Sequence, residues 1–393
     1  MTSDPAASSA LRRSDLPNWA RAIVVVFALY GFLVGVALLE SGIAAMGEGF
    51  QEGLLESVRN PVAGLFAGIL ATVLVQSSSV STATIVGLVG AGTMPVGLAV
   101  PMIMGANIGT TVTNTLASLG SLRRPDQFRR AFAGATMHDF FNLIAVAVLL
   151  PIELLSARLL DLPDEKGILA FVATRLTDVF RGTEIAEPGR SPLRQVVRVP
   201  AGWISDGVGA AIGVDVVDGI ALLVHGLALI FAALAGVTKN MRTLVAGSVE
   251  RAMNRMVGRG GGTVGIFVGI AVTIAVQTST ITTSILVPLV AAGVLSLRNA
   301  FPITLGANIG TTLTALIASL AVVHPEGLTI ALVHTLFNIT AILLLYPIRA
   351  VREVPLTIAT ALADQATRHR SLVAAYILGA FVVVPVLGVL LLR

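Results

Sequence analysis

Long apolar runs, separated by short polar segments, extend along most of the chain. Seven of these runs are candidates for complete membrane crossings and cover residues 20–40, 94–120, 126–156, 217–237, 300–320, 329–349 and 371–392. A helix needs about 20 predominantly apolar residues to span a bilayer. The runs lack the alternation over about 10 residues that marks the strands of a transmembrane barrel. The pattern therefore predicts membrane-spanning helices.

Two further apolar stretches, residues 61–92 and 263–293, are each divided by a polar segment near the middle. The first polar segment is Val-Gln-Ser-Ser-Ser and the second is Val-Gln-Thr-Ser-Thr. As helices, the two arms of the first stretch, residues 61–75 and 80–91, would be about 22 Å and about 18 Å long. Neither arm reaches across a hydrocarbon core of about 30 Å. Each stretch therefore predicts a re-entrant helical hairpin with a polar tip.

The chain contains two copies of one unit. Residues 66–76 align with residues 267–277, and the seven residues Gly-Ala-Asn-Ile-Gly-Thr-Thr that begin at Gly105 recur at Gly306. A later block, with a histidine and an asparagine four residues apart, also recurs. Its members are His138, Asn142, His334 and Asn338. Several separate blocks in one order indicate an internal repeat.

Loop charges predict that the two copies cross the membrane in opposite directions. Residues 40–60 carry four glutamates and one arginine, whereas the equivalent residues 239–259 carry five basic residues and one glutamate. The bias reverses in the next loop, where residues 123–130 hold four arginines and residues 321–326 hold only one histidine and one glutamate. Basic loops stay on the cytoplasmic side. Inverted repeats are typical of secondary transporters, which bind their substrates near the midplane between the repeats.

We therefore predict an all-α integral membrane protein with two inverted-topology repeats, each with a re-entrant helical hairpin and a broken transmembrane helix. In copy one, the break is expected within residues 105–109. The expected segments are a cytoplasmic tail (1–19), repeat one (20–156), an extracytoplasmic linker (157–215), repeat two (216–349), and a basic segment with the final transmembrane helix (350–393). We expect a multi-pass location in the cell membrane, surrounded by the lipid bilayer.

Composition supports this class and limits the chemistry. The chain is 55% hydrophobic and 12% charged, against about 25% charged residues in soluble domains. Residues 61–120, 260–297 and 301–323 contain no Asp, Glu, Lys, Arg or His. This excludes the usual acid–base or nucleophilic catalysis and argues against a proton relay. There is no cysteine, and no basic stripe with interleaved aromatics suggests nucleic-acid binding.

The polar groups of the repeated core are suited to binding ions. Hydroxyls, and the N–H groups at the start of a helix, donate hydrogen bonds to an oxyanion. Amide, hydroxyl and backbone carbonyl oxygens suit a hard cation such as sodium. An anion buried without Lys or Arg is costly, and co-bound cations would neutralise it. The residues therefore favour coupled uptake of a cation and an anion.

Other interpretations of the same motifs remain open. The Gly-x-x-x-Gly motifs at residues 64–68 and 105–109 are also helix-packing motifs. The tip hydroxyls could bond to carbonyls of their own helix, and His138 and His334 could be structural. Asp139 differs, because an intramembrane carboxylate is a functional candidate by default. A channel or a non-transporting receptor could use the same polar groups.

The sequence resembles the type II sodium-dependent phosphate cotransporters (the solute carrier 34 group) and their bacterial relatives. The segments that carry the resemblance are residues 60–64, 74–79, 101–110, 128–139 and 306–312. The resemblance implies sodium-driven import of inorganic phosphate, with Na+ as a co-transported ion and not a prosthetic group. It also implies that both hairpin tips form the phosphate and sodium sites and that Asp139 is linked to an additional sodium site, which makes transport electrogenic.

The resemblance implies candidate residues in the tips, in the repeated motif and in the later block around Asp139. The expected phosphate-binding residues are Gln76, Ser77, Ser78, Ser79, Gln277, Thr278, Ser279 and Thr280. The expected sodium-binding residues are Asn107, Thr110, Thr111, Asp139, Asn142, Asn308, Thr311 and Thr312. Two questions stay open: whether Arg124 or Arg129 contacts phosphate, and whether the anion is instead sulfate, arsenate or a dicarboxylate.

Overall fold

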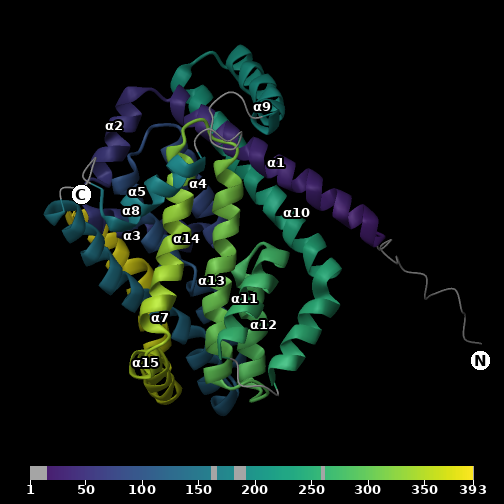
Figure 1. Ribbon diagram of the computed structural model, residues 1–393, viewed down its shortest axis with the longest axis vertical. Helices are drawn as coiled ribbons and strands as arrows, with labels where there is room; N and C mark the ends of the chain where they lie inside the picture. The colour runs from purple at the N-terminus through teal and green to yellow at the C-terminus, as the bar shows by residue number, and fades with distance from the viewer. Residues whose placement is uncertain (1–15, 161–165, 181–191, 258–261, 393) are drawn as a thin grey trace, which may run out of the picture.

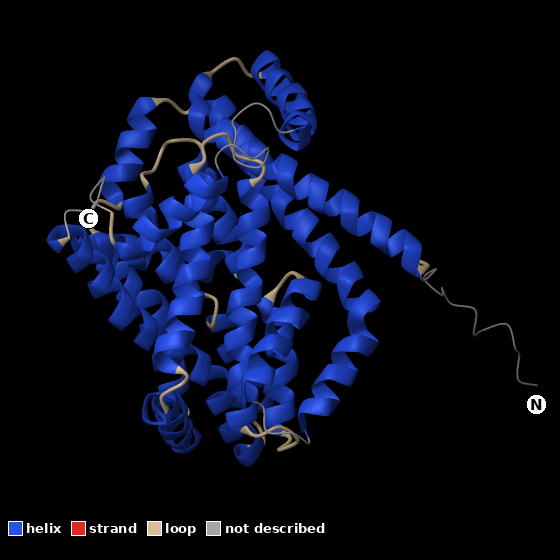
Figure 2. Ribbon diagram, in the orientation of Figure 1, coloured by secondary structure: helices blue, strands red, loops and turns tan. Residues whose placement is uncertain are grey.

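The computed structural model describes residues 16–160, 166–180, 192–257 and 262–392, and these are helical apart from short turns and loops, with no strand among them (Figure 2). Most of the predicted tail, residues 1–15, lies outside the described residues. The first copy contains α1 (Asn18–Ala45), α2 (Glu48–Ser57), α3 (Pro61–Val75), α4 (Ser78–Gly90), α5 (Val96–Gly109), α6 (Val112–Ser118), the 3-10 helix η2 (Leu119–Ser121) and α7 (Pro125–Leu159).

The linker and the second copy follow. The linker contains α8 (Ile168–Phe180) and α9 (Pro192–Ala211). The second copy contains α10 (Asp215–Val257), α11 (Gly262–Val276), α12 (Ser279–Ala291), α13 (Leu297–Ser319) and α14 (Glu326–Leu345). The C-terminal part contains α15 (Arg349–Arg368), α16 (Ser371–Leu378), the π-helical turn η4 (Gly379–Val383) and α17 (Val384–Leu392).

Seven helices in the described part of the chain are long and apolar enough to cross a membrane. They coincide with the seven apolar runs and cover Asn18–Ala45, Val96–Ser121, Pro125–Leu159, Asp215–Val245, Leu297–Ser319, Glu326–Leu345 and Ser371–Leu392. The arms of the two hairpins, α3, α4, α11 and α12, are shorter, with 13 or 15 residues each. The predicted all-α membrane class is confirmed.

α1 and α10 occupy equivalent places in the two copies and pack along each other in opposite directions. Gly35 on α1 faces Gly226 on α10, where an added Cβ would lie 2.9 Å from the Gly226 carbonyl oxygen. Further along α1, Gly42 faces Gly219, with the corresponding distance 2.8 Å. Residue numbers rise on one helix as they fall on the other. Figure 1 shows α2, which leads to the first hairpin, at the top, and the end of α10, which leads to the second, at the bottom.

Both predicted helix breaks differ from the structure. α13 is continuous from Leu297 to Ser319, so the break expected in the second copy is wrong. In the first copy, α5 continues through residues 105–109 and is interrupted only at Thr110 and Thr111, which keep right-handed helical backbone angles. The prediction failed because the glycines of this motif serve packing.

The glycines of the repeated motif let two helices approach closely. An added Cβ on Gly105 would collide with the backbone oxygen of Leu65 on α3, and one on Gly306 would collide with the backbone oxygen of Ile266 on α11. Gly68 on α3 has the same relation to the backbone of α5. The helix-packing interpretation of these glycines is therefore confirmed.

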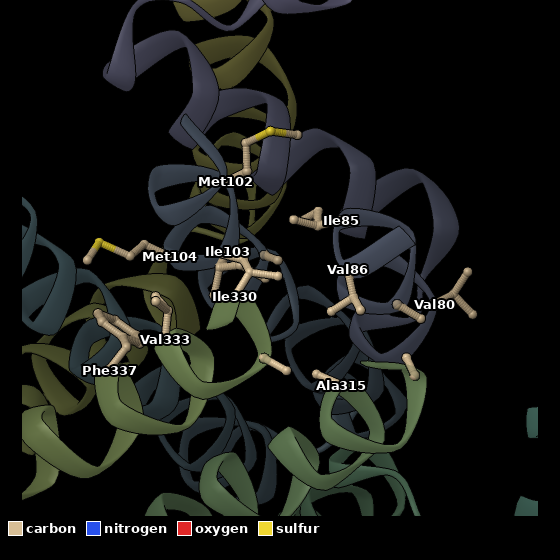
Figure 3. Close-up of a cluster of buried hydrophobic side chains, with 14 of the residues drawn as sticks. Val80, Ile85, Val86, Met102, Ile103, Met104, Ala315, Ile330, Val333 and Phe337 are labelled. Atoms are coloured by element: carbon tan, nitrogen blue, oxygen red, sulfur yellow. The ribbon is translucent and has the colours of Figure 1, made fainter. Parts of the chain in front are cut away.

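The apolar core joins the two copies. Figure 3 shows side chains from α4 and α5 beside side chains from α13 and α14. Val86, Ile103, Ile330 and Phe337 are completely buried there. α4 therefore packs against helices of the other copy, and the first hairpin is held by the second repeat.

Candidate ion-binding site

The two hairpin tips contain matching backbone strain. Gln76 has φ 54° and Gln277 has φ 58°, and these are the only described residues other than glycine with positive φ. Each glutamine amide donates to a carbonyl three residues back, Gln76 to Val73 at 2.5 Å and Gln277 to Ile274 at 2.7 Å. Left-handed backbone angles are uncommon at residues other than glycine, and such residues cluster at functional sites. Because the strain occurs at equivalent places, it singles out both tips.

The second arm of each hairpin starts immediately after its tip. Ser77 caps α4, and its hydroxyl accepts a hydrogen bond from the Val80 N–H at 3.4 Å. Thr278 occupies the equivalent position before α12 and makes no such bond. Ser78 and Ser279, the first residues of the two helices, are buried. The first N–H groups of a helix lack acceptors within it and lie at the positive end of its dipole, so both starts suit an anion.

α6 connects the two hairpins. The Thr113 hydroxyl donates to Gln76 Oε1 at 3.2 Å. The next residue, Asn114, accepts through Oδ1 from the Thr283 hydroxyl of α12 at 2.7 Å. Thr283 lies one turn beyond Ser279 and also donates to its carbonyl oxygen. Since consecutive Cα atoms are about 3.8 Å apart, neighbouring residues of one short helix connect the first tip to the helical turn that follows the second tip.

A buried amide of the second copy binds side chains of the first. Asn308 Oδ1 lies 2.6 Å from Nε2 of His138. Its Nδ2 donates to Asn142 Oδ1 at 2.8 Å. Asn142 in turn donates through Nδ2 to the Asn107 carbonyl oxygen at 2.7 Å. The repeated motif of α13 is thereby connected to α7 and α5.

The equivalent amide of the first copy binds side chains of the second. Asn107 Oδ1 accepts from Asn338 Nδ2 at 3.3 Å and lies 3.4 Å from Nε2 of His334. Each copy therefore presents its asparagine to the histidine and asparagine of the other. The interpretation of the histidines as structural groups fits these contacts, since all the side chains are buried.

Asp139 lies in a separate polar cluster on α7. Its Oδ2 accepts from the Thr115 hydroxyl at 3.1 Å and from the Tyr376 hydroxyl of α16 at 2.7 Å. The residue is only 4% exposed, and Oδ1 accepts no hydrogen bond of normal geometry from the described residues. The residue at this place in copy two is Thr335, so the cluster has no symmetric counterpart. A buried carboxylate without a basic partner is costly and favours a cation.

The predicted sodium residues do not form one group. Asn107, Asn142 and Asn308 are brought together, and Asp139 lies with other partners. The remaining hydroxyls bond to carbonyls of their own helices: Thr110 to Ala106 at 2.8 Å, Thr111 to Ile108 at 2.8 Å, Thr311 to Ala307 at 2.9 Å and Thr312 to Ile309 at 2.7 Å. These contacts are the local bonds typical of threonine within helices.

The arginines considered as phosphate contacts have other partners. Arg129 pairs with Asp364 on α15, and this hydrogen bond holds the pKa of Asp364 below its usual range. Arg124 donates to Gln127 at 3.2 Å. Arg130 donates to the Ala291 carbonyl oxygen at 2.9 Å. Ala291 ends α12, about 18 Å from the tip for a helix of this length, so Arg130 binds the far end of the hairpin.

Sequence reasoning missed several residues of the site. Thr283 repeats Thr82 of the first hairpin, so the internal repeat held a signal for it. Asn114 has Ala315 at the equivalent place, and Tyr376 lies beyond both copies. For these two residues the sequence held no comparable signal, because only the folded chain brings them to the hairpin and to Asp139.

The sequence is similar to those of known proteins. The family model described as Na+/Pi-cotransporter matches residues 32–159 and 229–360, one stretch in each copy. Sodium-dependent phosphate transport protein 2A of Ovis aries is 33% identical over 97% of this chain and 69% of that protein. The 2A protein of Rattus norvegicus is 34% identical over 91% and 65%, and the 2B protein of Homo sapiens is 31% identical over 93% and 64%.

The chain thus spans about two thirds of the length of these relatives. No solved structure matches it. The family model covers most of both copies, including the two tips, the repeated glycine–asparagine motif and the residues of the buried amide network. The chain belongs to the Na+/Pi-cotransporter family.

Proposed function

We propose that the protein is a sodium-coupled symporter that imports inorganic phosphate across the cell membrane by alternating access. One observation carries the proposal: neighbouring residues of α6 contact two uncharged, hydroxyl-rich hairpins from different copies, Thr113 at the tip residue Gln76 and Asn114 at Thr283, one turn beyond the second tip. The similar proteins named above are sodium-dependent phosphate transport proteins, and the tips supply donors that such a substrate needs.

Phosphate would bind between the tips. The N–H groups at the starts of α4 and α12 donate to anionic oxygens, and the helix dipoles add positive potential. Hydroxyls of Ser78 and Ser279 provide further donors close to those helix starts. The described arginines near the hairpin base are engaged elsewhere, so the negative charge of phosphate needs another compensation.

Sodium ions would supply that compensation. Asp139 and the amide oxygens of Asn107, Asn142 and Asn308 provide buried oxygen ligands. Carboxylate, amide and carbonyl oxygens suit a hard cation. Neutralising the anion in this way makes its burial possible without lysine or arginine. With a further sodium at Asp139, more positive than negative charge crosses, and we propose that transport is electrogenic.

Alternating access is supported by the paired organisation of the molecule. The equivalent helices α1 and α10 run antiparallel, and each hairpin packs on helices of the other copy. Inverted repeats allow one copy to move against the other around a central site. Movement of either hairpin would change the surroundings of both tips, because α6 contacts both.

Uptake of labelled phosphate into proteoliposomes tests the proposal. A sodium gradient directed inward should drive accumulation above equilibrium, and lithium or proton gradients of equal size should drive it poorly. Accumulation that ignores the sodium gradient would indicate a channel. Saturable phosphate binding without accumulation would indicate a receptor. Either result contradicts the proposal.

A second candidate is a sodium-coupled carrier of another small anion, such as sulfate, arsenate or a dicarboxylate. It is favoured by the absence of a described arginine contact to either tip, since hydroxyl and N–H donors alone discriminate weakly between oxyanions. Competition for sodium-dependent uptake separates the two candidates. Phosphate should inhibit its own uptake more strongly than sulfate or a dicarboxylate at equal concentration.

A further inference from the structure

Two basic loops that are far apart in the sequence meet at an apolar groove of about 330 Å³. One wall comes from the start of η2 and the turn that follows this helix, and the other comes from α16. The groove is lined by Leu119, Leu122, Val373, Ala374, Ile377 and the side chain of Arg370. Its volume lies within the range of about 300–1,000 Å³ that is common for small-ligand sites.

The wall from α16 belongs to the most exposed of the candidate membrane spans. Only 11% of the apolar window in Ser371–Leu392 is buried inside the protein. Of the residues of α16 that line the groove, Leu378 is 56% exposed and Ala374 is also exposed, whereas Val373 is buried beneath them. A membrane-spanning helix with such a surface contacts lipid, so acyl chains would have access to the exposed part of the groove.

Positive charge gathers at the end of the groove that lies beside the loops. Arg370 directly precedes α16, and Arg368 lies two residues before Arg370. Arg123 and Arg124 directly follow Leu122 of the opposite wall. All four are exposed. The acidic residues on these segments are Asp126 and Asp364, and Asp364 is paired with Arg129, which leaves the positive charge in excess.

We propose that this groove binds an anionic phospholipid. Its phosphate would contact Arg370 and the neighbouring arginines, and one acyl chain would lie against Ala374, Ile377 and Leu378. Basic pockets between transmembrane helices on the cytoplasmic side bind anionic headgroups, and the loop charges place these arginines on that side. Apolar walls with charge at one end match the two parts of a phospholipid.

The groove is directly connected to the Asp139 cluster. Ile377 lines the groove, and its neighbour Tyr376 donates to Asp139 Oδ2 at 2.7 Å. α16 thus contacts lipid on one face and the buried carboxylate on another. A bound phospholipid would hold the helix that positions Tyr376.

Electron paramagnetic resonance of spin-labelled lipids tests the proposal on the full chain in phosphatidylcholine bilayers. Labelled phosphatidylglycerol should be immobilised by the protein more strongly than labelled phosphatidylcholine. Two changes should reduce this preference: Ala374→Phe, which fills the groove, and Arg370→Gln, which removes one charge. For Arg370→Gln the expected loss of association is about fivefold, the effect of one arginine near an anionic surface.

Matched controls distinguish groove binding from general surface effects. Ala375→Phe changes the exposed neighbour of Ala374 outside the groove lining, and Arg349→Gln removes an exposed arginine at the start of α15. Both should keep the lipid preference. Equal immobilisation of the two lipids by the unmodified protein, or equal losses in variants and controls, would overturn the proposal.

Two other occupants are also tested. Displacement of labelled phosphatidylglycerol by inorganic phosphate at millimolar concentration would show a site for the free ion and overturn the proposal. A dimer that dissociates on Ala374→Phe, with no lipid preference, would assign the groove to a second copy and do the same. These measurements need no ion gradient, so their outcome is independent of whether the protein transports phosphate.

Discussion

Gln76 and Gln277 occupy left-handed backbone where glycine would cause less strain. Glycine could not make the amide contacts of these side chains, in which each Nε2 bonds a carbonyl of its own helix and Gln76 Oε1 accepts from Thr113. Strain of this kind costs of order 1–3 kcal/mol and persists where surrounding structure imposes it. Each tip therefore retains a glutamine side chain although its backbone conformation is strained.

The buried serines that follow the tips should be essential for uptake. Ser279→Phe and Ser78→Phe place a large apolar group at the start of α12 or α4, where the anion is expected to bind. Phosphate uptake in proteoliposomes should fall to background in both variants. Leu74→Phe provides the control, because Leu74 lies near the first tip but is 81% exposed. Uptake by either serine variant at the control rate would refute the assignment of the tips.

Asp139 should determine the charge that accompanies each phosphate. Asp139→Asn removes the negative charge and keeps an oxygen acceptor for Tyr376, so a sodium ion bound there should be lost. The current per phosphate, from electrical recording combined with labelled uptake, should decrease. Tyr376→Phe removes the hydroxyl but leaves the carboxylate of Asp139. In this variant the ratio of current to phosphate uptake should remain close to that of the unmodified protein. An unchanged ratio in Asp139→Asn would exclude the proposed role.

At this scale the sequence predicts residue types better than it predicts partners. The repeat singled out Asn107 and Asn308, which the structure connects through Asn142, and their role in binding sodium stays a prediction. It also suggested Thr110, Thr111, Thr311 and Thr312, whose hydroxyls instead bond to their own helices. A threonine side chain can always find a carbonyl one turn back, so composition alone cannot determine which of the two contacts it makes.

The Gly-x-x-x-Gly motif of α3 contains one glycine that close helix packing requires and one that it does not. Gly68 lies on α3 where a side chain would collide with the backbone of Met102, whereas Gly64, one turn earlier on the same face, has only ordinary contacts, the nearest 3.6 Å from the Met102 side chain. Backbone atoms cannot move aside as the end of a flexible side chain can. The two glycines therefore form a natural pair for comparison.

Gly68→Ala should destabilise the protein more than Gly64→Ala does. Forcing α3 away from α5 should lower the unfolding free energy by about 1–3 kcal/mol, the usual cost of overpacking. Unfolding in detergent, followed by circular dichroism against temperature or denaturant, measures the difference. Equal midpoints for the two variants would mean that the close approach of the helices contributes nothing to stability.

The elements themselves were largely predictable. Apolar length located all seven long helices, and the polar interruptions located the hairpin tips within two residues of the helix ends. The expected breaks were not found as predicted, since a Gly-x-x-x-Gly motif permits either an unwound segment or a close helix contact. Only the neighbouring helix, α3 or α11, decides between these alternatives, and that neighbour is a tertiary feature.

For the whole molecule, the direction of each copy across the membrane is the central prediction. The chain has no cysteine, so one introduced thiol reports one position. Arg123→Cys and His324→Cys change exposed residues in equivalent loops of the two copies. A membrane-impermeant maleimide should label Cys at 123 only from the cytoplasmic side and Cys at 324 only from the other side. Labelling of both from one side would exclude inverted repeats.

The two hairpins also differ in the hydrogen bonds between the hydroxyls of their arms, and this difference suggests what a second conformation would look like. The Thr273 hydroxyl of α11 lies 2.8 Å from that of Thr282 on α12. In the first hairpin, Thr72 Oγ1 has no hydrogen-bond partner among the described residues. Ser81, which is equivalent to Thr282, donates to the Ser77 carbonyl oxygen instead. If each copy adopts the conformation of the other during turnover, each hairpin should also adopt the hydroxyl hydrogen bonds of the other.

The opposite-facing form should then unite Thr72 with Ser81 and separate Thr273 from Thr282. Double cysteine variants at each pair can be oxidised in a chain that has no other thiol. A disulfide at 273 and 282 should hold the present form, and one at 72 and 81 should accumulate only when sodium and phosphate allow turnover. The unequal hydroxyl pairs would thus act as a latch that closes on one hairpin at a time.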